Sequence, residues 1–214
     1  EAGAQIVNSS NELLSFADIV IKVLPPSLEE TSHLKIGSVV ISFFQSTREI
    51  SKVKALAERS ITGFSMHLIP RTTLAQKMDA LSSQANIAGY KAVLMAATHL
   101  GVFMPLLMTA AGTIRPAKVL ILGAGVAGLQ AIATAKRLGA QVEAFDVRPV
   151  VKEQVESLGA KFIAVESDSD EGVGEGGYAK ETSEDYKRRQ QELIHEHMSK
   201  ANVVITTALI PGRP

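Results

Sequence analysis

The chain has 214 residues, of which 46% are hydrophobic and 21% charged, a balance typical of a globular protein with one or two domains. Its 22 basic and 22 acidic side chains give a net charge of zero at pH 7, which argues against binding to nucleic acid or to an anionic membrane surface. The absence of cysteine excludes disulfides, thiol catalysis and thiolate metal ligands.

Residues 1–75 alternate strand-like and helix-like patterns. A helix is expected at about 46–59, where apolar residues recur at helical spacing after Ser46 or Thr47 as the N-cap. Because this alternation favours a parallel sheet, we interpret the segment as an N-terminal α/β subdomain. The sequence begins without a signal-peptide pattern and as if within a domain, so we expect the subdomain to be partial. Short apolar runs predict its strands within 17–23, 37–44 and 60–70.

Residues 76–115 predict a connecting helix followed by a linker. The part from 92 to 114 carries no charged residue, and it is long enough to span a bilayer. However, Gly101 and Pro105 would break a helix in its middle. We therefore expect a buried helix to about Leu100, then a packed turn and a second short segment.

Residues 116–214 predict a Rossmann domain that binds a dinucleotide and is truncated at its C-terminus. A strand, KVLIL, precedes the turn Gly123–Gly128, and an amphipathic helix follows it. In such a turn the first glycine permits the tight bend, the second admits a pyrophosphate, and the third lets the helix pack on the strand. The diphosphate then lies at the helix N-terminus. The candidate cofactor-binding residues here are Gly123, Gly125, Val126, Ala127 and Gly128.

An acidic residue, Asp146, ends the second strand of this domain, 146 − 128 = 18 positions after the last glycine. Its carboxylate can bind both ribose hydroxyls of adenosine and would repel a 2′-phosphate, which favours NAD(H) over NADP(H). Arg148 is the competing signal, because an arginine here can hold that phosphate. The alternative is a glycine turn without a ligand and a solvated acid, but strand, turn, helix and acid all agree with the nucleotide site.

The stretch RTTLAQKMDALSS, residues 71–83, is ambiguous by itself. Read as a helix from about Thr72, it places Gln76 and Asp79 on one face, with Arg71 one turn before Gln76. A solvated helix face is the simpler interpretation. The position between two α/β halves, where ligand clefts form, favours a site.

Several segments together resemble the proton-translocating nicotinamide nucleotide transhydrogenase family, specifically its soluble NAD(H)-binding domain I. The resemblance is specific from Arg71 onward and looser before Pro70. The segments that carry it are RTTLAQKMDALSSQANIAGYKAV, MTAAGTIRPAKVLILGAGVAGLQAIATAKRLGA, FDVRPVVKEQVESLGAKF, GGYAKE and TTALIPGRP.

The resemblance implies roles for individual residues. Arg71, Gln76 and Asp79 match a loop that orients the nicotinamide, and Ser82 matches a further nicotinamide contact. Tyr178 matches a tyrosine on a mobile loop that folds over the bound nucleotide. The resemblance also includes Val147, Arg148, Gly177 and Ala208 among the cofactor-binding residues.

The same resemblance implies cofactors and partners. This chain would hold NAD(H), while NADP(H) would bind a partner domain, and a membrane domain of the same complex would couple hydride transfer to proton movement. A homodimer is expected, on the cytoplasmic face of a bacterial inner membrane or the matrix face of a mitochondrial one. Hydride transfer needs no metal or nucleophile, and the sequence shows neither metal-ligand spacing nor a catalytic triad.

Two alternatives stay open. Alanine dehydrogenase shares the two-domain layout, but that family's substrate-binding lysine and histidine match poorly. Lys22 is near the lysine slot with Leu24 closer to it, and Gln45 occupies the histidine position. The second alternative is a non-catalytic NAD-binding or dimerisation module.

Overall fold

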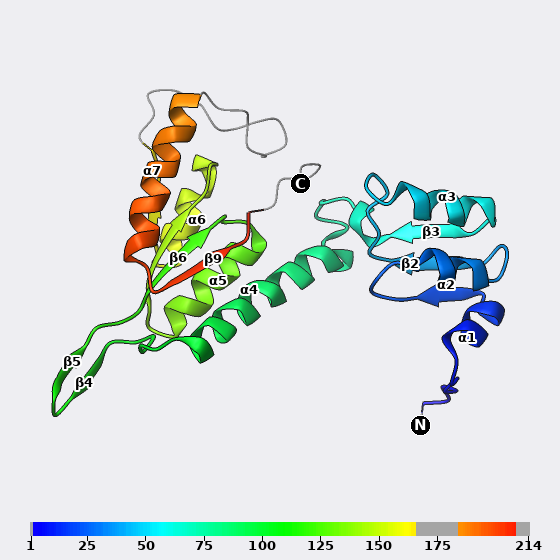
Figure 1. Ribbon diagram of the computed structural model, residues 1–214, viewed down its shortest axis with the longest axis horizontal. Coiled ribbons are helices and arrows are strands. Elements are labelled where there is room, and N and C mark those ends of the chain that lie inside the picture. Colours follow the sequence, from blue (N-terminus) through cyan, green and yellow to red (C-terminus); the bar gives the residue numbers. More distant parts are fainter. Residues whose placement is uncertain (1, 166–183, 209–214) are drawn as a thin grey trace. The chain divides into compact units, whose positions relative to one another are not determined.

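The computed structural model describes residues 2–165 and 184–208, and the chain divides into two compact units, 1–81 and 82–214 (Figure 1). Each unit contains its own parallel sheet. The predicted α/β class, with two parallel-sheet subdomains and a long helix between them, is confirmed.

The first unit is a three-stranded parallel sheet with strand order β1-β2-β3 and short helices in the connections. Its apolar core is small and is formed by Leu14, Val20, Leu34, Val40, Leu56 and Ile61. Its elements are α1 (Ser10–Phe16), β1 (Ile19–Ile21), α2 (Leu28–His33), β2 (Val39–Ser42), α3 (Ile50–Glu58), β3 (Thr62–Ser65), η1 (Met66–Leu68) and η2 (Gln76–Met78).

Local sequence signals explain some of these boundaries and miss another. Ser27 and Glu30 form a reciprocal capping box that starts α2, which satisfies two backbone N–H groups at once. Helix α3 begins later than predicted, after Glu49 rather than after Ser46 or Thr47. The Glu49 carboxylate accepts a hydrogen bond from the backbone N–H of Gln45, so the preceding residues form a turn and not the first turn of the helix.

The second unit is a four-stranded parallel sheet of order β8-β7-β6-β9, covered on both faces. One face packs on α4, α5 and α6, and the other packs on α7 through Leu120, Phe145 and Ile163. Its elements are α4 (Ala80–His99), β4 (Leu107–Thr109), β5 (Gly112–Ile114), β6 (Lys118–Leu122), α5 (Val126–Arg137), β7 (Gln141–Phe145), η3 (Pro149–Val151), α6 (Lys152–Ser157), β8 (Lys161–Ile163), α7 (Glu184–Lys200) and β9 (Val203–Thr206).

The uncharged segment forms the second half of α4 and the β4–β5 hairpin. Within the described residues, no helix combines the length and apolar character needed to cross a bilayer. The expectation of a buried helix is wrong, because only Gly89 and Val93 of α4 are buried. A lack of charge does not by itself imply burial: α4 packs along one narrow side and leaves Met95 53% exposed.

Helix α4 approaches α5 very closely at one point. A Cβ atom on Gly89 would lie 2.0 Å from the backbone oxygen of Ala127, so only glycine fits there. This contact places α4 directly against the first turn of α5, which is the helix that follows the glycine turn.

Candidate functional site

The predicted glycine turn lies where the strand order of the second sheet reverses. The chain runs from β6 outward to β7 and β8, then returns through α7 to β9 on the other side of β6. The carboxyl ends of β6 and β9 therefore lead in opposite directions, and ligands bind in such crevices of parallel sheets. Gly123 directly follows β6, and Thr207 directly follows β9.

Two of the three glycines are required by the protein's own packing. Gly123 has a φ of 99°, and a Cβ there would lie 2.8 Å from the backbone nitrogen of Ala208. A Cβ on Gly128 would lie 1.8 Å from the Gly123 oxygen, so the helix could not approach the strand. These glycines set the tight bend and the close helix packing expected from the motif.

The middle glycine has no such explanation. Gly125 has a φ of −79°, which any residue adopts, and a Cβ there would meet no atom of residues 2–165 or 184–208 within 4 Å. It immediately precedes Val126, the first residue of α5. The missing side chain leaves the free backbone N–H groups of the helix open to an approaching anion. The residues present therefore fit a dinucleotide diphosphate.

Asp146 lies beside this turn and is 8% exposed. Its carboxylate accepts a hydrogen bond from the backbone N–H of Ala124 at 2.7 Å, which ties the end of β7 to the glycine turn. The Arg148 guanidinium donates to both carboxylate oxygens, from Nε and from Nη2, each at 2.9 Å. The Arg148 backbone N–H adds a fourth bond, also at 2.9 Å.

These contacts determine the charge of Asp146. Burial raises the pKa of its carboxyl, but the hydrogen bonds from Arg148 and Ala124 outweigh burial and hold the pKa below its usual range. Asp146 is therefore ionised at neutral pH. Both of its oxygens are occupied by donors, so ribose hydroxyls can bind them only if the Arg148 side chain moves.

The other predicted residues of this unit lie in the same region. Ala208 lies against Gly123, whereas Val147 packs partly buried against the core on the α7 side. Val126 is 44% exposed, and Ala127 is half-buried beneath Gly89.

Sequence reasoning missed Thr207. Its hydroxyl donates to the Gly123 carbonyl at 2.8 Å and fixes the glycine turn to the end of β9. The available signal was its position directly after the strand that neighbours β6, because residues at the carboxyl ends of adjacent parallel strands meet at one edge.

The predicted nicotinamide-side residues lie mostly in the first unit. Arg71 and Gln76 are exposed, while Asp79 is half-buried. The predicted continuous helix from Thr72 is not formed: Gln76 begins the 3₁₀ turn η2, and α4 starts only at Ala80. The backbone N–H of Asp79 donates to the Gln76 carbonyl, so this turn, and not a helix face, relates the two residues.

The remaining predictions fall in different parts of the chain. Ser82 is half-buried in the first turn of α4, in the second unit. Tyr178 and Gly177 lie outside the described residues.

Comparison with known proteins identifies the family. The description "Alanine dehydrogenase/PNT, N-terminal domain" matches residues 1–88, and "Alanine dehydrogenase/PNT, C-terminal domain" matches residues 92–214. The chain belongs to the alanine dehydrogenase/PNT family. The resemblance to transhydrogenase is thereby confirmed at the level of the family, and this family implies nicotinamide nucleotide binding.

Relatives within the alanine dehydrogenase/PNT family include both of its named activities. The chain is 48% identical over its full length to the first portion of NAD(P) transhydrogenase subunit alpha from Rhodospirillum rubrum and covers 57% of that protein. It is 30% identical to alanine dehydrogenase of Staphylococcus saprophyticus, over 74% of this chain and 43% of that protein. The chain thus spans about half the length of these relatives.

Solved structures agree with this assignment. A transhydrogenase from Sinorhizobium meliloti matches the whole chain and 56% of its own, with a TM-score of 0.81 and 47% identity. An L-alanine dehydrogenase matches with a TM-score of 0.72 at 23% identity, covering 99% of this chain and 53% of its own, which supports the fold alone.

The Asp146 network predicts a pH-dependent contribution to stability. Asp146→Asn should lower the free energy of unfolding at pH 7 by about 1–3 kcal/mol, because the amide cannot replace the charged bonds to Arg148. Since the pKa is lowered in the folded state, this stabilisation is present above the unfolded-state pKa of roughly 3.9 and is lost as pH falls through the folded-state pKa. Urea unfolding followed by circular dichroism at pH 7 and at about pH 3 measures both values.

Asp18→Asn is the matched control, because Asp18 pairs with Lys35 but its side chain is 84% exposed, and its removal should change stability little. A difference between the wild type and Asp146→Asn that stays constant from neutral to acidic pH would contradict the assigned role of the charge.

Proposed function

We propose that this chain is the NAD(H)-binding part of a transhydrogenase that passes a hydride between NADH and NADP⁺, in a reaction coupled to proton translocation by a separate membrane domain. The observation that carries the proposal is Gly125. Its lack of a side chain has no explanation in the packing of the described residues, and it lies at the N-terminus of α5 in the strand-order crevice. A dinucleotide diphosphate explains it.

The second unit would bind the adenosine half of NAD(H). Backbone N–H groups at the start of α5 bind the diphosphate, and the carboxylate of Asp146 accepts hydrogen bonds from the adenosine ribose. Arg148 first releases Asp146, and its freed guanidinium then faces the same region. A 2′-phosphate would approach the buried negative charge of Asp146, which favours NAD(H) over NADP(H).

The residues Arg71, Gln76, Asp79, Ser82 and Tyr178 would position the nicotinamide. The nicotinamide supplies the hydride at its C4 carbon, and the protein supplies placement. A guanidinium donates to a carboxamide oxygen, and a carboxylate accepts from its NH₂, so Arg71 and Asp79 can fix the rotation of the ring. Tyr178 would cover the site and exclude water.

The other parts of the enzyme would lie on partner domains. NADP(H) would be held by a second domain, and a membrane domain would move the proton. The present chain would work on the cytoplasmic face of a bacterial inner membrane or on the matrix face of a mitochondrial one.

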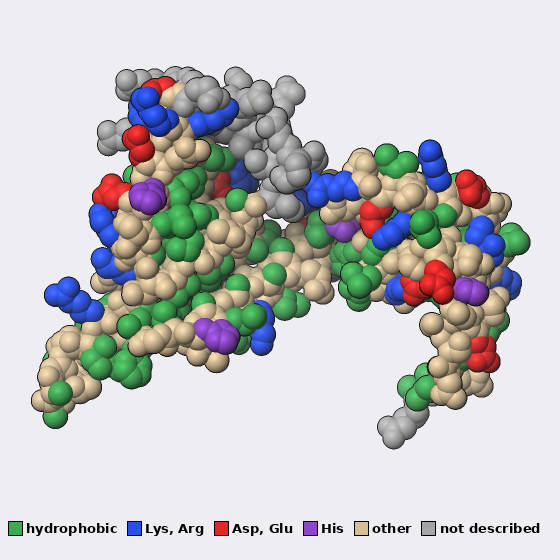
Figure 2. All heavy atoms as spheres, viewed as in Figure 1, with side chains coloured by type: hydrophobic (Ala, Val, Ile, Leu, Met, Phe, Trp, Pro, Cys, Tyr) green, Lys and Arg blue, Asp and Glu red, His purple; other side chains and the backbone are tan. Residues whose placement is uncertain are grey.

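We also infer that two copies of the chain pair through the β4–β5 hairpin. The hairpin has no third strand among the described residues, and a two-stranded hairpin is marginally stable alone. Leu106 and Met108 are 54% and 82% exposed, and Figure 2 shows apolar side chains at the surface along it. Phe103 and Met95 extend this apolar surface towards α4.

An alanine dehydrogenase activity is the less favoured alternative. Lys22, the nearest match to that family's lysine, pairs through its ammonium with Glu30 at 2.6 Å. Leu24 is exposed, and Gln45 occupies the histidine position. A keto-acid site would therefore lack both expected groups.

The first prediction concerns nucleotide affinity. The chain should bind NADH more tightly than NADPH at matched salt, as measured by isothermal titration calorimetry. Gly125→Ala should weaken NADH binding at least about tenfold, since a methyl group occupies the space of the diphosphate. Its melting temperature should be nearly unchanged, because the Cβ meets no described atom.

Gly101→Ala is the control for this variant, because Gly101 also has open space around it but lies outside the turn. It should leave NADH affinity unchanged. Equal or tighter binding of NADPH, or full NADH affinity in Gly125→Ala, would reject the proposed binding mode.

The second prediction concerns hydride transfer. In the intact enzyme reconstituted with its NADP(H)-binding partner, Asp79→Asn should lower single-turnover transfer by roughly ten- to a hundredfold, about 1.4–2.7 kcal/mol. NADH affinity should change less than about tenfold, because groups that set the reacting geometry affect rate more than binding. Lys77→Gln changes charge in the same exposed turn and should leave the rate unchanged. An unaltered rate in Asp79→Asn would leave η2 as a solvated turn.

The third prediction concerns self-association. Met108→Asp should raise the dimer dissociation constant at least about tenfold in sedimentation equilibrium, since a carboxylate would be buried in an apolar contact. Ile6→Asp introduces the same charge at another exposed apolar residue and should have no effect. If both variants self-associate like the unchanged chain, the hairpin is not the contact surface.

A further inference from the structure

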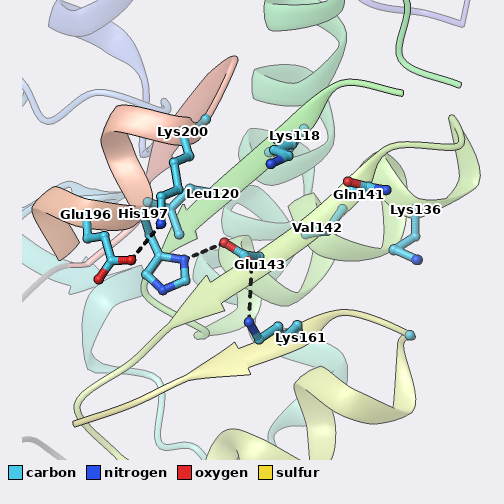
Figure 3. Close-up of a pocket in the computed structure, with 13 residues that line it drawn as sticks. Lys118, Leu120, Lys136, Gln141, Val142, Glu143, Lys161, Glu196, His197 and Lys200 are labelled. Atoms are coloured by element: carbon cyan, nitrogen blue, oxygen red, sulfur yellow. Dashed lines mark hydrogen bonds and ion pairs between the residues drawn. The ribbon is translucent and has the colours of Figure 1, made fainter. Parts of the chain in front are cut away.

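A second concave site lies at the opposite end of the second sheet from the glycine turn. The pocket has a volume of about 550 Å³ and lies where β6, β7 and β8 begin, beside the last turn of α7 (Figure 3). Strand β6 separates it from Gly123 by five residues, which is roughly 16 Å at the usual rise per residue. It is therefore distinct from the proposed nucleotide site, and nothing in the proposed function uses it.

Charged side chains dominate this pocket. Four lysines and one histidine line it, against two glutamates, Glu143 and Glu196. The two acids are already paired: Glu143 binds His197 Nδ1 at 2.6 Å and lies 3.5 Å from Lys161 Nζ, and Glu196 binds Lys200 Nζ at 2.6 Å. Within the described part of the chain, no carboxylate pairs with the ammonium groups of the remaining two, Lys118 and Lys136.

The pocket keeps its acids ionised and compensated. Burial raises the pKa of Glu143, but hydrogen bonding to His197 and the charge of Lys161 outweigh burial and lower it overall. With His197 neutral, the lining has four positive and two negative side chains, a surplus of two positive charges. The surplus corresponds to Lys118 and Lys136, which Figure 3 shows towards one side of the pocket, with Gln141 near them.

Lys136 is directed along the pocket edge by a glycine. Gly159 has a φ of 78°, and a Cβ there would lie 3.3 Å from Lys136 Cε and 3.9 Å from its Nζ. Because Gly159 has no side chain, the half-buried Lys136 can run across it. This restricts the lysine more than an ordinary surface position would, and less conformational entropy is lost when its ammonium binds a ligand.

We propose that this pocket binds a small molecule with two anionic groups, either phosphates or carboxylates, one near Lys118 and the other near Lys136. The Gln141 side-chain amide can donate a further hydrogen bond to such a ligand. The volume suits a small molecule, and the acids, held by His197, Lys161 and Lys200, repel the ligand less than free carboxylates would.

His197 provides a local signal for the test. Inorganic pyrophosphate and malonate are titrated separately into the full chain, at constant pH and ionic strength, while the imidazole C–H resonances are followed by NMR. His197→Gln assigns the signal. A saturable shift of the His197 resonance is expected, with a dissociation constant of about 1 mM. An anion bound only at the glycine turn is too distant to produce this shift, so the outcome is independent of NADH binding.

Paired variants decide between a built site and general charge attraction. Lys118→Gln combined with Lys136→Gln should raise the dissociation constant at least about tenfold. Lys54→Gln combined with Lys91→Gln removes the same charge outside the pocket and should change it less than about twofold. A response to pyrophosphate alone assigns the site to phosphates, and a response to both probes assigns it to dianions in general.

Two outcomes would overturn the proposal. One is an unmoved His197 resonance with both probes at about 10 mM. The other is equal weakening by the two double variants, which would mean that only the net charge of the chain attracts the anion.

Discussion

The hydrogen bond from the Ala124 backbone N–H to the Asp146 carboxylate holds the candidate site together. It joins the end of β7 to the turn that follows β6, so the acid and the start of α5 keep a fixed relation. Thr207 fixes the other side of the same turn to β9. The turn is thus attached to both neighbouring strands. Because the proposed phosphate ligands are backbone groups, their positions depend on these attachments and not on any side-chain rotamer.

The same carboxylate links binding to protein electrostatics. In this structure Arg148 supplies the positive charge that a buried Asp146 requires. Ribose hydroxyls are neutral donors, so they can replace the hydrogen bonds of the guanidinium but not its charge. Arg148 must therefore stay near Asp146 after it releases the carboxylate. Selectivity for a nucleotide would then reflect the balance between this pair and its ligand, and not the acid alone.

Sequence reasoning predicted the second unit well because its signals are local and mutually consistent. The run KVLIL, the three glycines and Asp146 each have one structural explanation, and all of them agree. The sequence could not reveal that Gly123 and Gly128 serve packing while Gly125 does not, since that distinction depends on which atoms surround each position. Thr207 escaped notice for a related reason: its partner, Gly123, is 84 positions away.

The region before α4 was harder to predict. Residues 72–79 have helical composition, yet they form turns, with the buried Ala75 between Thr72 and η2. Local propensity is a weak guide over so short a stretch, and tertiary packing decides the outcome. The exposed apolar surface of α4 misled in the opposite direction, because composition alone does not distinguish a core from a contact surface.

The contact between Gly89 and Ala127 has a mechanical consequence. Two backbones meet there without an intervening side chain, so no rotamer change can absorb a displacement. Helix α4 has 20 residues, about 30 Å in length, and pivots at a point near its middle. A small tilt of this rod would press directly on the peptide group that begins α5. The stiffness of the phosphate-binding end of α5 is thus set in part by a helix that carries none of its ligands.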